Sequence, residues 1–376
     1  MDKKVKILVI NPGSTSTKVA YFEDEKQLYR GELDVKAENL KGVTTAMAEL
    51  DERERTVMDF MRENGIDENE LDIIVSRGGI LPACDGGAYK VNQLMIDILT
   101  YAPEKEHASN VGCMIAKKIA DRLGIDAVIY DPPVVDEFTE IAHMTGVPEI
   151  RIKPIGHMLN SRCVSREVAK KIGKPYEECN FIVAHYGGGC SVSAHKKGRI
   201  VDQINDDIGS MSTQRAGRIP TGEMIKLCYS GKYTEKEMHR KLIGNSGFVA
   251  YFGTQDARQV EDMAKNGDEK AQLVMAAMAY QCGKMIGEIA AVLKGEVDRI
   301  IFTGGMSHSK YFLDQVIDYV KFIAPIEIVP GEREMEGLAL GALRVVRGDE
   351  KAKEWDILPV GCSSQEEFYG KYVTKS

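Results

Sequence analysis

Two turns rich in glycine and hydroxyl side chains have the composition of phosphate-binding loops. The first covers 11–18, Asn-Pro-Gly-Ser-Thr-Ser-Thr-Lys, and the second covers 187–193, Gly-Gly-Gly-Cys-Ser-Val-Ser. Each lies between two runs of residues that predict β-strands. Glycine lets the backbone approach an anion closely, and hydroxyl and backbone N–H groups donate hydrogen bonds. Two such hairpins in one chain indicate a duplicated fold that binds one polyphosphate from both sides.

The first turn is not a Walker A loop. That motif needs a glycine, four residues, Gly-Lys-Ser/Thr and then a helix. Here only Gly13 is present, and the chain continues into 18–23, Lys-Val-Ala-Tyr-Phe-Glu, which alternates like a strand. The alternative to a phosphate-binding hairpin is an ordinary turn made of polar residues. Because the pattern occurs twice, we favour phosphate binding.

Composition narrows the class of protein. A chain of 376 residues predicts two domains. Its net charge of −8 argues against a nucleic-acid binder, and no apolar run reaches the ~18 residues of a membrane span. The eight cysteines form no Cys-x-x-Cys pair, which argues against zinc and indicates free thiols in a reducing compartment. We therefore expect a cytoplasmic protein with neither nucleic acid nor membrane as a partner.

The predicted elements occur in the same order in both halves of the chain. In the first half we expect strands at 5–10, 18–23, 27–34, 71–76 and 127–130 and helices at 44–64 and 109–123. After a helix at 159–172, the second half contains strands at 180–185, 192–204, 298–302 and 325–329, and the second of these reverses in a hairpin turn at 196–199. Helices are expected at 268–294, between 307 and 325, and at 334–347. This is an α/β fold in which the order βββαβα occurs twice, with insertions. Two similar halves of this kind enclose a cleft, where a ligand binds.

The glycine-rich motifs together resemble those of the acetate and butyrate kinases, members of the sugar kinase, Hsp70 and actin superfamily. They are most similar to the butyrate and branched-chain fatty acid kinases. The resemblance implies two domains of the ribonuclease H-like, actin-like ATPase type. It also implies reversible transfer of the γ-phosphoryl group of ATP to a short carboxylic acid, with ADP as product and Mg²⁺ as cofactor. The motifs are 11–18, Ser76-Arg-Gly-Gly79, His185-Tyr-Gly-Gly-Gly189, Gln214-Arg-Ala-Gly217, Phe302-Thr-Gly-Gly305 and 334–341.

The resemblance assigns a role to each domain. Residues 1–155 are expected to form the acyl-substrate domain, joined by the tail 348–376, and residues 156–347 to form the nucleotide-binding domain. The segment 356–376 matches no part of the family. It is a poorly ordered end, a dimer strap or a docked segment, and we favour the first because terminal residues are often poorly ordered. The implied partners are a small carboxylate and a nucleotide. We also expect a homodimer or a higher homo-oligomer.

A carboxylate acceptor is already ionised at neutral pH, because carboxyl pKa values lie near 4. Such a kinase needs no general base, but it needs positive charge to bring an anion against a polyphosphate. Arg77 follows a predicted strand and precedes two glycines, at the usual ligand side of an α/β sheet. By resemblance, Arg77 binds the carboxylate and Arg215 holds the transferring phosphoryl group. The alternative for either arginine is a surface ion pair.

The resemblance also assigns the residues of the first turn. Asn11 is expected near the phosphoryl group, Ser14 and Ser16 on the phosphates, and Lys18 at the phosphate end. Asp131, at the end of a predicted strand, is expected to position the catalytic groups. Its alternative is the opening residue of an Asp-Pro turn.

Glu334 and Asn11 match the residues that hold Mg²⁺ in the family. Mg²⁺ usually keeps several waters and binds one or two carboxylates together with phosphate oxygens. Acidic residues at a helix start also stabilise the helix dipole, and that is the alternative for Glu334. His157 is expected to stabilise the phosphoryl group in transfer, and His185 opens the second phosphate hairpin.

By resemblance the nucleotide lies on the second half, where Asp256 and Arg258 border the adenine. The alternative for these two residues is the start of a surface helix. The glycines expected to contact the nucleotide are Gly187, Gly188, Gly189, Gly304 and Gly305. We interpret four further histidines as surface or packing residues: His143, His195, His239 and His308.

Substrate choice depends on the size of the acyl pocket. The turns 78–80 and 187–189 lack bulky side chains, which predicts an enlarged pocket suited to butyrate or isobutyrate. One methylene changes affinity by only ~1–3 kcal/mol, so an acetate or propionate kinase stays open. Two further alternatives are a non-catalytic ATP-binding module of the same superfamily and a sugar or polyol kinase. The latter would use Asp131 as a base against the acceptor hydroxyl.

Overall fold

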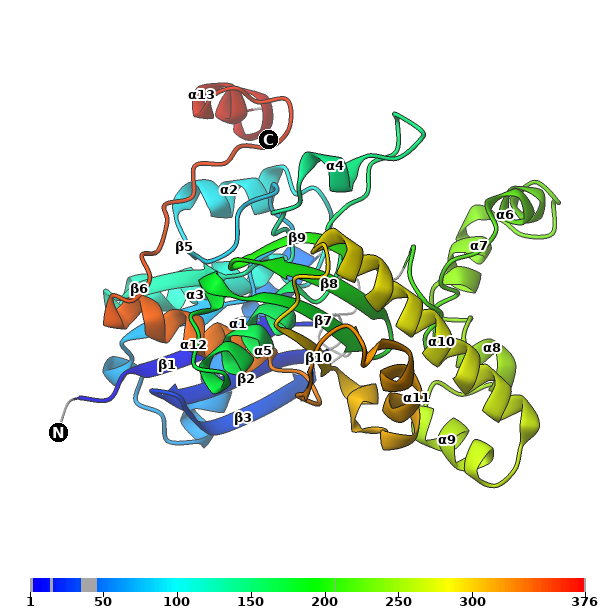
Figure 1. The fold of residues 1–376 in the computed structure, drawn as a ribbon. Coiled ribbons are helices and arrows are strands. Elements are labelled where there is room, and N and C mark those ends of the chain that lie inside the picture. Colours follow the sequence, from blue (N-terminus) through cyan, green and yellow to red (C-terminus); the bar gives the residue numbers. More distant parts are fainter. Residues whose placement is uncertain (1–2, 14–15, 35–45, 206, 375–376) are drawn as a thin grey trace. The chain divides into compact units, whose positions relative to one another are not determined.

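The chain folds into two compact α/β units. The computed structural model describes residues 3–13, 16–34, 46–205 and 207–374. Unit 1 comprises Met1–Asp136 and Arg333–Ser376, and unit 2 comprises Glu137–Glu332 (Figure 1). Among the helices of the described residues, none has the length and apolar character that a membrane span needs.

Unit 1 is built on a six-stranded sheet with the strand order β3-β2-β1-β4-β6-β5. The first three strands form an antiparallel meander, β4 and β6 continue the sheet in parallel, and β5 is antiparallel to β6. Their bounds are β1 Lys6–Pro12, β2 Ser16–Glu23, β3 Lys26–Asp34, β4 Ile73–Ser76, β5 Ala88–Lys90 and β6 Asp126–Tyr130.

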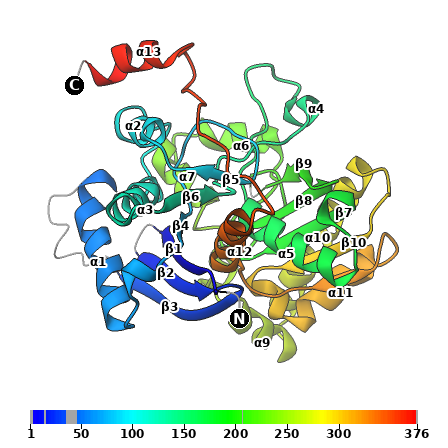
Figure 2. The ribbon, with the colours of Figure 1, turned by 90° about the vertical axis from the view of Figure 1, so that its left-hand side faces the viewer.

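Helices cover both faces of this sheet. Figure 2 shows α1 and α3 on one side and α12 on the other, and α2 packs against α3. Gly341 lets α12 approach β6 closely, since a Cβ there would lie 2.4 Å from the ring of Tyr130. The helix bounds are α1 Leu50–Glu63, α2 Gln93–Tyr101, α3 Asn110–Leu123 and α12 Glu334–Arg347.

Unit 2 repeats this plan with a five-stranded sheet in the order β11-β10-β7-β8-β9. The antiparallel meander β7-β8-β9 corresponds to β1-β2-β3, and the parallel strands β10 and β11 correspond to β4 and β6. The bounds are β7 Asn180–Tyr186, β8 Cys190–Lys196, β9 Arg199–Ile204, β10 Arg299–Thr303 and β11 Ile326–Ile328.

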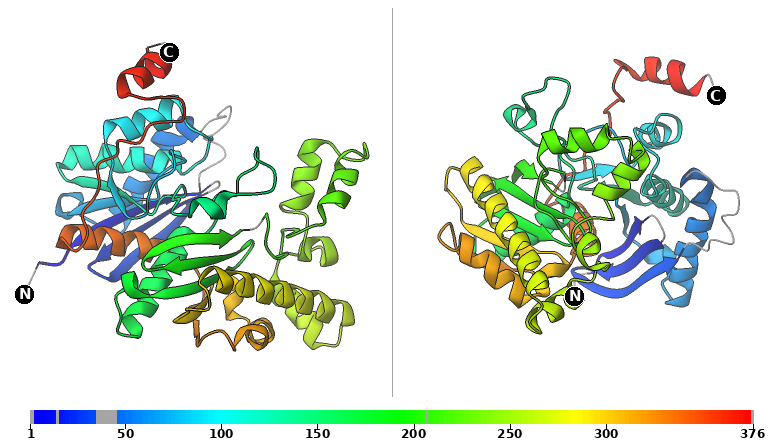
Figure 3. Two further views of the ribbon diagram at one scale, coloured as in Figure 1. Left: turned by 45° about the horizontal axis from the view of Figure 1, so that its top comes forward. Right: turned by 90° about the vertical axis from the view of Figure 1, so that its right-hand side faces the viewer.

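Alternate residues of β7 face different helices of unit 2. Phe181 and Val183 pack with α5 (Met158–Lys171), whereas Ile182 and Ala184 pack with α10 (Glu269–Val292) and α11 (Lys310–Val320). Several shorter helices are inserted, and Figure 3 shows α6 and α7, in yellow-green, standing away from the sheet of this unit. The inserted helices are α4 Glu140–His143, α6 Thr221–Cys228, α7 Glu235–Leu242, α8 Phe248–Phe252 and α9 Ala257–Lys265.

The predicted α/β class and the duplicated order of strands are confirmed. The expected first helix is shorter: α1 begins at Leu50 after a 3₁₀ turn at Ala46–Glu49, and residues 44–45 lie outside the described part. The strand β5 and the helices α2, α4 and α6 to α9 were not predicted.

The domain boundaries differ from the expected division at 155/156 and 347/348. Residues 137–155 belong to unit 2, because Glu137 makes a buried ion pair with Arg162 (2.9 Å) and accepts the backbone N–H of Ile200 (2.8 Å). Helix α12 belongs to unit 1, because its apolar side packs on β1, β4 and β6. The sequence pattern correctly predicted a helix at 334–347, but such a pattern does not indicate which sheet the helix covers.

The C-terminal tail is part of unit 1, as expected, but it is ordered. The N–H of Lys353 donates to the carbonyl of Ala88 on β5 (2.9 Å), so the tail extends the edge of the sheet. Trp355 and Phe368 are 1% and 0% exposed and belong to the core of this unit. The expectation that 356–376 is poorly ordered is therefore wrong for the described residues of the tail. Its aromatic residues supply the apolar area that holds it in place.

Candidate active site

Three predicted site residues meet in unit 1. Asn11 lies near the end of β1, Arg77 directly follows β4, and Glu334 is the first residue of α12. The Asn11 amide donates to Glu334 Oε2 (3.1 Å), and Arg77 Nη2 lies 3.5 Å from Glu334 Oε1. The structure thus brings together two polar residues and one arginine from segments far apart in the sequence.

The sheet accounts for this convergence. β1 and β4 are parallel neighbours, with Ile10 opposite Ser76, and the N–H of Arg77 donates to the carbonyl of Ile10 (3.1 Å). The carboxyl ends of parallel strands lie at one edge of a sheet, where α/β proteins bind ligands. Helix α12 packs on both strands and places Glu334 at the same edge.

Arg77 has donor capacity for an anion. Its side chain is 13% exposed, and its Nη1 atom is buried without a hydrogen-bond partner among the described residues. Burial, and then the charges of Lys105, Arg77 and Arg53, lower the pKa of His107. Buried donors are normally paired, so the unpaired guanidinium nitrogen of Arg77 suits a carboxylate or phosphate.

The first turn places Ser16 and Lys18 beside Asn11. Gly13 N–H donates to the carbonyl of Ser16 (2.7 Å), and Lys18 lies opposite Asn11 in the β1–β2 register. Ser16 Oγ donates to Glu32 Oε1 (3.0 Å), whereas Lys18 makes no ion pair with any residue that the structure describes. The predicted Ser14 lies outside the described residues. Strand β2 follows the turn, which confirms that it is not a Walker A loop.

Arg53 binds residues of this turn, and no pattern in the sequence predicted that contact. It is fully buried on α1, donates to Thr17 Oγ1 (2.9 Å) and the carbonyl of Ser16 (3.3 Å), and pairs with Glu49 (2.6 Å). A charge in an amphipathic helix gives no local signal of such a role.

Asp131 has a backbone role. It is 1% exposed, adopts a positive φ of 40° at the end of β6, and its Oδ1 accepts the N–H of Gly87 (2.8 Å). A left-handed conformation at a non-glycine residue is uncommon and needs support from its surroundings. This geometry is that of a turn residue, the alternative weighed for Asp131, and its catalytic role stays a prediction.

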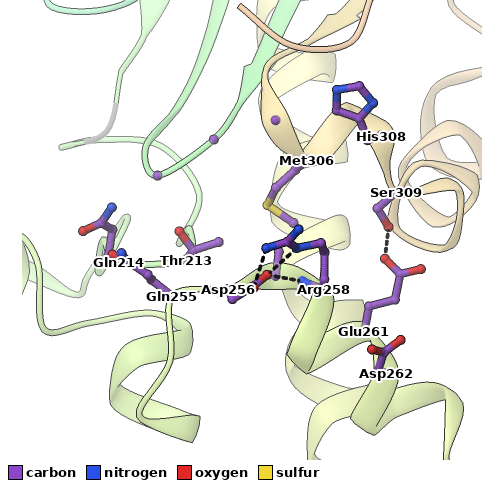
Figure 4. Close-up of a pocket in the computed structure, with 14 residues that line it drawn as sticks. Thr213, Gln214, Gln255, Asp256, Arg258, Glu261, Asp262, Met306, His308 and Ser309 are labelled. Atoms are coloured by element: carbon purple, nitrogen blue, oxygen red, sulfur yellow. Dashed lines mark hydrogen bonds and ion pairs between the residues drawn. The ribbon is translucent and has the colours of Figure 1, made fainter. Parts of the chain in front are cut away.

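The predicted nucleotide residues surround a cavity of about 950 Å³ in unit 2 (Figure 4). Five of them line it: Gly187, Gly188, Asp256, Arg258 and Gly305. The sequence did not single out the other lining residues, which are Thr213, Gln214, Gln255, Ala257, Glu261, Asp262, Met306, His308 and Ser309. Only Gln214 had a signal, as part of the motif 214–217, while His308 is an exposed residue that also lines the cavity.

Steric contacts explain why glycine occupies positions in the turns beside this cavity. Gly187 N–H donates to the carbonyl of Gly189 (2.8 Å), which closes the turn between β7 and β8. Gly304 has a φ of 86°, and a Cβ there would lie 2.4 Å from the carbonyl oxygen of Tyr186. Only glycine allows these two backbones to approach so closely.

Asp256 and Arg258 lie at the start of a surface helix, which was the alternative to a role at the adenine. The Asp256 carboxylate caps α9 by accepting the Arg258 N–H (3.0 Å) and pairs with the Arg258 guanidinium (2.8 Å). The Arg258 side chain is 88% exposed, so this ion pair contributes little to the free energy of folding. Both residues start a surface helix and line the cavity.

His157 and His185 form a stacked pair in unit 2. Their ring centroids lie 3.6 Å apart at an interplanar angle of 5°. His157 Nδ1 contacts Ser191 Oγ (3.1 Å), and His185 Nδ1 contacts the Asn160 amide (3.0 Å). Burial, and then the charge of His157, hold the pKa of His185 well below its usual range. His185 is therefore neutral at pH 7.

Arg215 follows Gln214, a lining residue of the cavity. It is half-buried, and its backbone forms a bridge with Ile243 that fixes the segment. Its Nη1 reaches the carbonyl of Gln214 at 3.5 Å, a long hydrogen bond.

The glycines of the turn 78–80 pack closely against their neighbours. A Cβ on Gly79 would lie 2.7 Å from Leu99 Cδ2 and 2.8 Å from Asn110 Oδ1, so the space beside it is filled. Gly78 likewise faces Ile129, with a Cβ distance of 3.2 Å to its Cδ1. These glycines allow close packing of the turn on α2, α3 and β6, and the enlarged acyl pocket stays a prediction.

In the described part of the chain, no group of three or more His, Cys, Asp or Glu side chains is placed to bind a metal ion. Glu334 and Asn11 are adjacent to each other, as predicted. One carboxylate and one amide suit an ion that takes its other ligands from phosphate and water.

Comparison with known proteins identifies the class. The profile of the acetokinase family matches residues 89–329. Butyrate kinase 2 of Clostridium acetobutylicum is 45% identical over 354 residues, which cover 94% of this chain and 99% of that protein. Probable butyrate kinase 2 of Caldanaerobacter subterraneus subsp. tengcongensis is 46% identical over 349 residues, 93% of this chain and 99% of that protein.

The fold has close counterparts among solved structures. Porphyromonas gingivalis acetate kinase superposes with a TM-score of 0.73 at 20% identity, covering 91% of this chain and 100% of that chain. A propionate kinase from Francisella tularensis gives a TM-score of 0.70 at 18% identity, covering 89% and 98%. The protein is an α/β kinase of the actin-like ATPase fold. It belongs to the acetokinase family, which confirms the resemblance found in the sequence.

Proposed function

We propose that this protein is a butyrate kinase, which transfers a phosphoryl group reversibly between ATP and butyrate or a branched short-chain acid. The products of the forward reaction are the acyl phosphate and ADP. The observation that carries the proposal is the arrangement of Asn11, Arg77 and Glu334, with an unpaired guanidinium nitrogen on Arg77. The identity to butyrate kinases over nearly the whole chain supports the choice of acid.

The acceptor chemistry follows from Arg77. A carboxylate arrives ionised and needs orientation, not deprotonation. A guanidinium presents two parallel N–H donors to the two oxygens of a carboxylate. Arg77 binds the acid while Glu334 holds its other nitrogen, and Arg215 stabilises negative charge on the transferring phosphoryl group.

Unit 2 binds the nucleoside, the first turn of unit 1 contacts the phosphates, and Arg77 of unit 1 binds the acid. The cavity beside Gly187, Gly188 and Gly305 holds ATP, with Asp256 and Arg258 bordering the adenine. The further predicted contacts are Gly189, Gly304, His157 and His185 in unit 2, and Ser14, Ser16, Lys18 and Asp131 in unit 1.

Glu334 and Asn11 would hold Mg²⁺. The Glu334 carboxylate is half-buried and adjacent to the Asn11 amide, so a hard oxygen donor set is present. Bound Mg²⁺ neutralises phosphate charge during transfer. The proposed ligands are therefore the nucleotide, the small acid and Mg²⁺.

We further propose a homodimer or higher homo-oligomer, in which unit 2 supplies apolar contacts. Ile141, Met144 and Ile150 are 80%, 68% and 60% exposed on one segment. Exposed apolar side chains that gather into one patch mark interaction sites, and these three lie within ten residues of one another.

The test is trapping of the acyl phosphate as its hydroxamate. The protein is incubated with ATP, Mg²⁺, hydroxylamine and each of acetate, propionate, butyrate, isobutyrate and valerate. We expect acid-dependent hydroxamate, with the highest kcat/KM for a four-carbon acid. ATP hydrolysis without hydroxamate would instead indicate a non-catalytic module, and consumption that depends on glycerol or hexose would indicate a sugar kinase.

An acetate or propionate kinase is the second candidate, for a specific reason. The space beside Gly79 is filled by Leu99 and Asn110, so the turn 78–80 contributes no extra volume for a longer acid. Equal or higher kcat/KM for acetate in the same panel would establish this alternative.

A further inference from the structure

The side-chain amide of Gln214 lies against the second glycine turn. A Cβ on Gly188 would lie 2.7 Å from Gln214 Nε2 and 3.6 Å from its Cδ. The amide therefore occupies the volume that a side chain at position 188 would take. Figure 4 shows Gln214 and Thr213 on one side of the cavity, with His308 and Ser309 on the other.

Two hydrogen bonds fix the backbone around Gln214, one to the same turn and one to the segment that follows α7. Ser212 Oγ donates to the carbonyl of Gly188 (2.5 Å), and the N–H of Gly244 donates to the carbonyl of Gln214 (2.7 Å). The backbone of Gln214 is therefore held beside the turn. A donor on a fixed backbone loses less conformational entropy when it binds an anion.

The amide itself has no hydrogen-bond partner among the residues that the structure describes. It is half-buried and lines the cavity together with Gly187, Gly188 and Gly305. An amide carries two N–H donors, and partly buried donors normally have acceptors. A ligand in the cavity would supply the missing acceptor.

We propose that Gln214 is a phosphate-contacting residue, whose amide donates a hydrogen bond to a phosphate oxygen of the nucleotide bound over the turn 187–189. It acts in place of a side chain at position 188, which glycine leaves free. The ligand class is a nucleoside di- or triphosphate, and the inference rests on the nucleotide site of the proposed function.

Calorimetric titration with ATP, ADP and adenosine tests this role. Gln214→Ala should raise the Kd of ATP about tenfold, the effect of one hydrogen bond to a charged group. Gln214→Glu keeps the size but places a carboxylate against phosphate, so its loss should be larger. Adenosine, which lacks phosphate, should bind both variants as it binds the wild type. Gln259→Ala is the control, because Gln259 is exposed on α9 and does not line the cavity.

A double-mutant cycle tests the geometry. In Gly188→Ala the new methyl group displaces the flexible end of Gln214, so ATP affinity should fall as in Gln214→Ala. The double variant should then be no weaker than either single variant, because both remove the same contact. Additive losses would overturn the proposed placement.

Two results would overturn the role itself: unchanged ATP affinity in Gln214→Ala and Gln214→Glu, or an equal loss of ATP and adenosine binding, which marks a structural role. The hydroxamate assay on the wild type separates this inference from the proposed function. A wild type that binds ATP but forms no acyl phosphate refutes the function, and the variants still decide the role of Gln214. A wild type that binds no nucleotide refutes both.

Discussion

The charge balance around Glu334 governs the site of unit 1 at the residue scale. Its carboxylate accepts from Asn11, and Arg77 Nη2 lies 3.5 Å from it, whereas Arg77 Nη1 has no hydrogen-bond partner among the described residues. In the proposed role lysine could not replace Arg77, because a single ammonium cannot serve Glu334 and a substrate carboxylate with fixed geometry.

Removing the guanidinium tests this balance. We expect Arg77→Ala to raise the KM for butyrate by well over tenfold, since charge-assisted hydrogen bonds contribute about 1.5–3 kcal/mol. The Kd of ATP should not change, because Arg77 is assigned to the acid and is none of the residues proposed to contact the nucleotide. Initial rates at varied acid, with calorimetric titration of ATP, give both quantities.

Arg122→Ala is the matched control for Arg77→Ala. Arg122 pairs with Glu68 on the surface of the same unit (2.6 Å), and such pairs are worth little. Its kinetics should equal the wild type. Unchanged acid kinetics in Arg77→Ala would refute the role assigned to this arginine.

Site residues were predictable from the sequence where they belong to a recognisable motif. Asn11, Arg77 and Glu334 follow from glycine-rich turns and a helix start, and the structure places them together. Arg53 and Gln214 act through contacts 36 and 26 positions away in sequence, on Thr17 and Gly188. No local periodicity encodes such contacts, so sequence alone could not assign them.

A buried histidine couples the meander β7-β8-β9 to its neighbours at the element scale. His195 on β8 is 0% exposed and contacts Tyr176 (2.7 Å), Ser165 (3.2 Å) and Ser193 (3.0 Å). Burial, and then the charge of Arg162, hold its pKa well below the usual range. The folded protein therefore keeps this ring neutral, whereas the unfolded chain binds a proton near pH 6.5.

This difference predicts acid sensitivity of unit 2. Stability from a neutral histidine is complete above pH 6.5 and is lost as pH falls toward the lowered pKa, by up to about 1.4 kcal/mol per pH unit. His195→Gln cannot titrate, so its free energy of unfolding should fall less steeply between pH 6.5 and 5. Urea unfolding followed by circular dichroism measures both slopes, and identical slopes would contradict the prediction.

The C-terminal tail is a second element whose role became clear only from packing. Phe368 is fully buried, and the hydroxyl of Tyr369 donates to Asp97 on α2 (2.8 Å). α2 also carries Leu99, which fills the space beside Gly79, next to Arg77. The tail thereby supports the helix that packs against the turn after Arg77.

Trp355, the one tryptophan of the chain, reports on this tail. Phe368→Ala should destabilise unit 1 by about 3 kcal/mol, the cost of a cavity at a buried aromatic residue. The emission of Trp355 should shift to longer wavelength as the tail detaches. Val360→Ala is the control, since that side chain is 90% exposed. Wild-type emission and stability in Phe368→Ala would show that the tail does not depend on this anchor.

Elements with clear periodicity were predictable, and short or inserted ones were not. Strand β5 has three residues, Ala88–Lys90, too few for an alternating pattern to be recognised. Helix α12 was recognised, yet its assignment to unit 1 depends on contacts with a sheet more than 200 residues earlier in the chain.

The duplicated plan is the main feature at the scale of the whole molecule. The strand order β3-β2-β1-β4-β6 of unit 1 recurs as β9-β8-β7-β10-β11 in unit 2, and each copy carries one glycine-rich turn. Unit 1 carries Arg77, which we propose binds the acid, and unit 2 carries the cavity that we propose for the nucleotide.

Synthesis of ATP from an acyl phosphate and ADP tests the proposed carboxylate kinase activity most directly. The protein is mixed with ADP, Mg²⁺ and either butanoyl phosphate or acetyl phosphate, and the ATP formed is measured by luciferase luminescence. We predict ATP formation that depends on the acyl phosphate, with a higher kcat/KM for butanoyl phosphate than for acetyl phosphate. No ATP above the enzyme-free control with either donor would contradict the assignment as a carboxylate kinase.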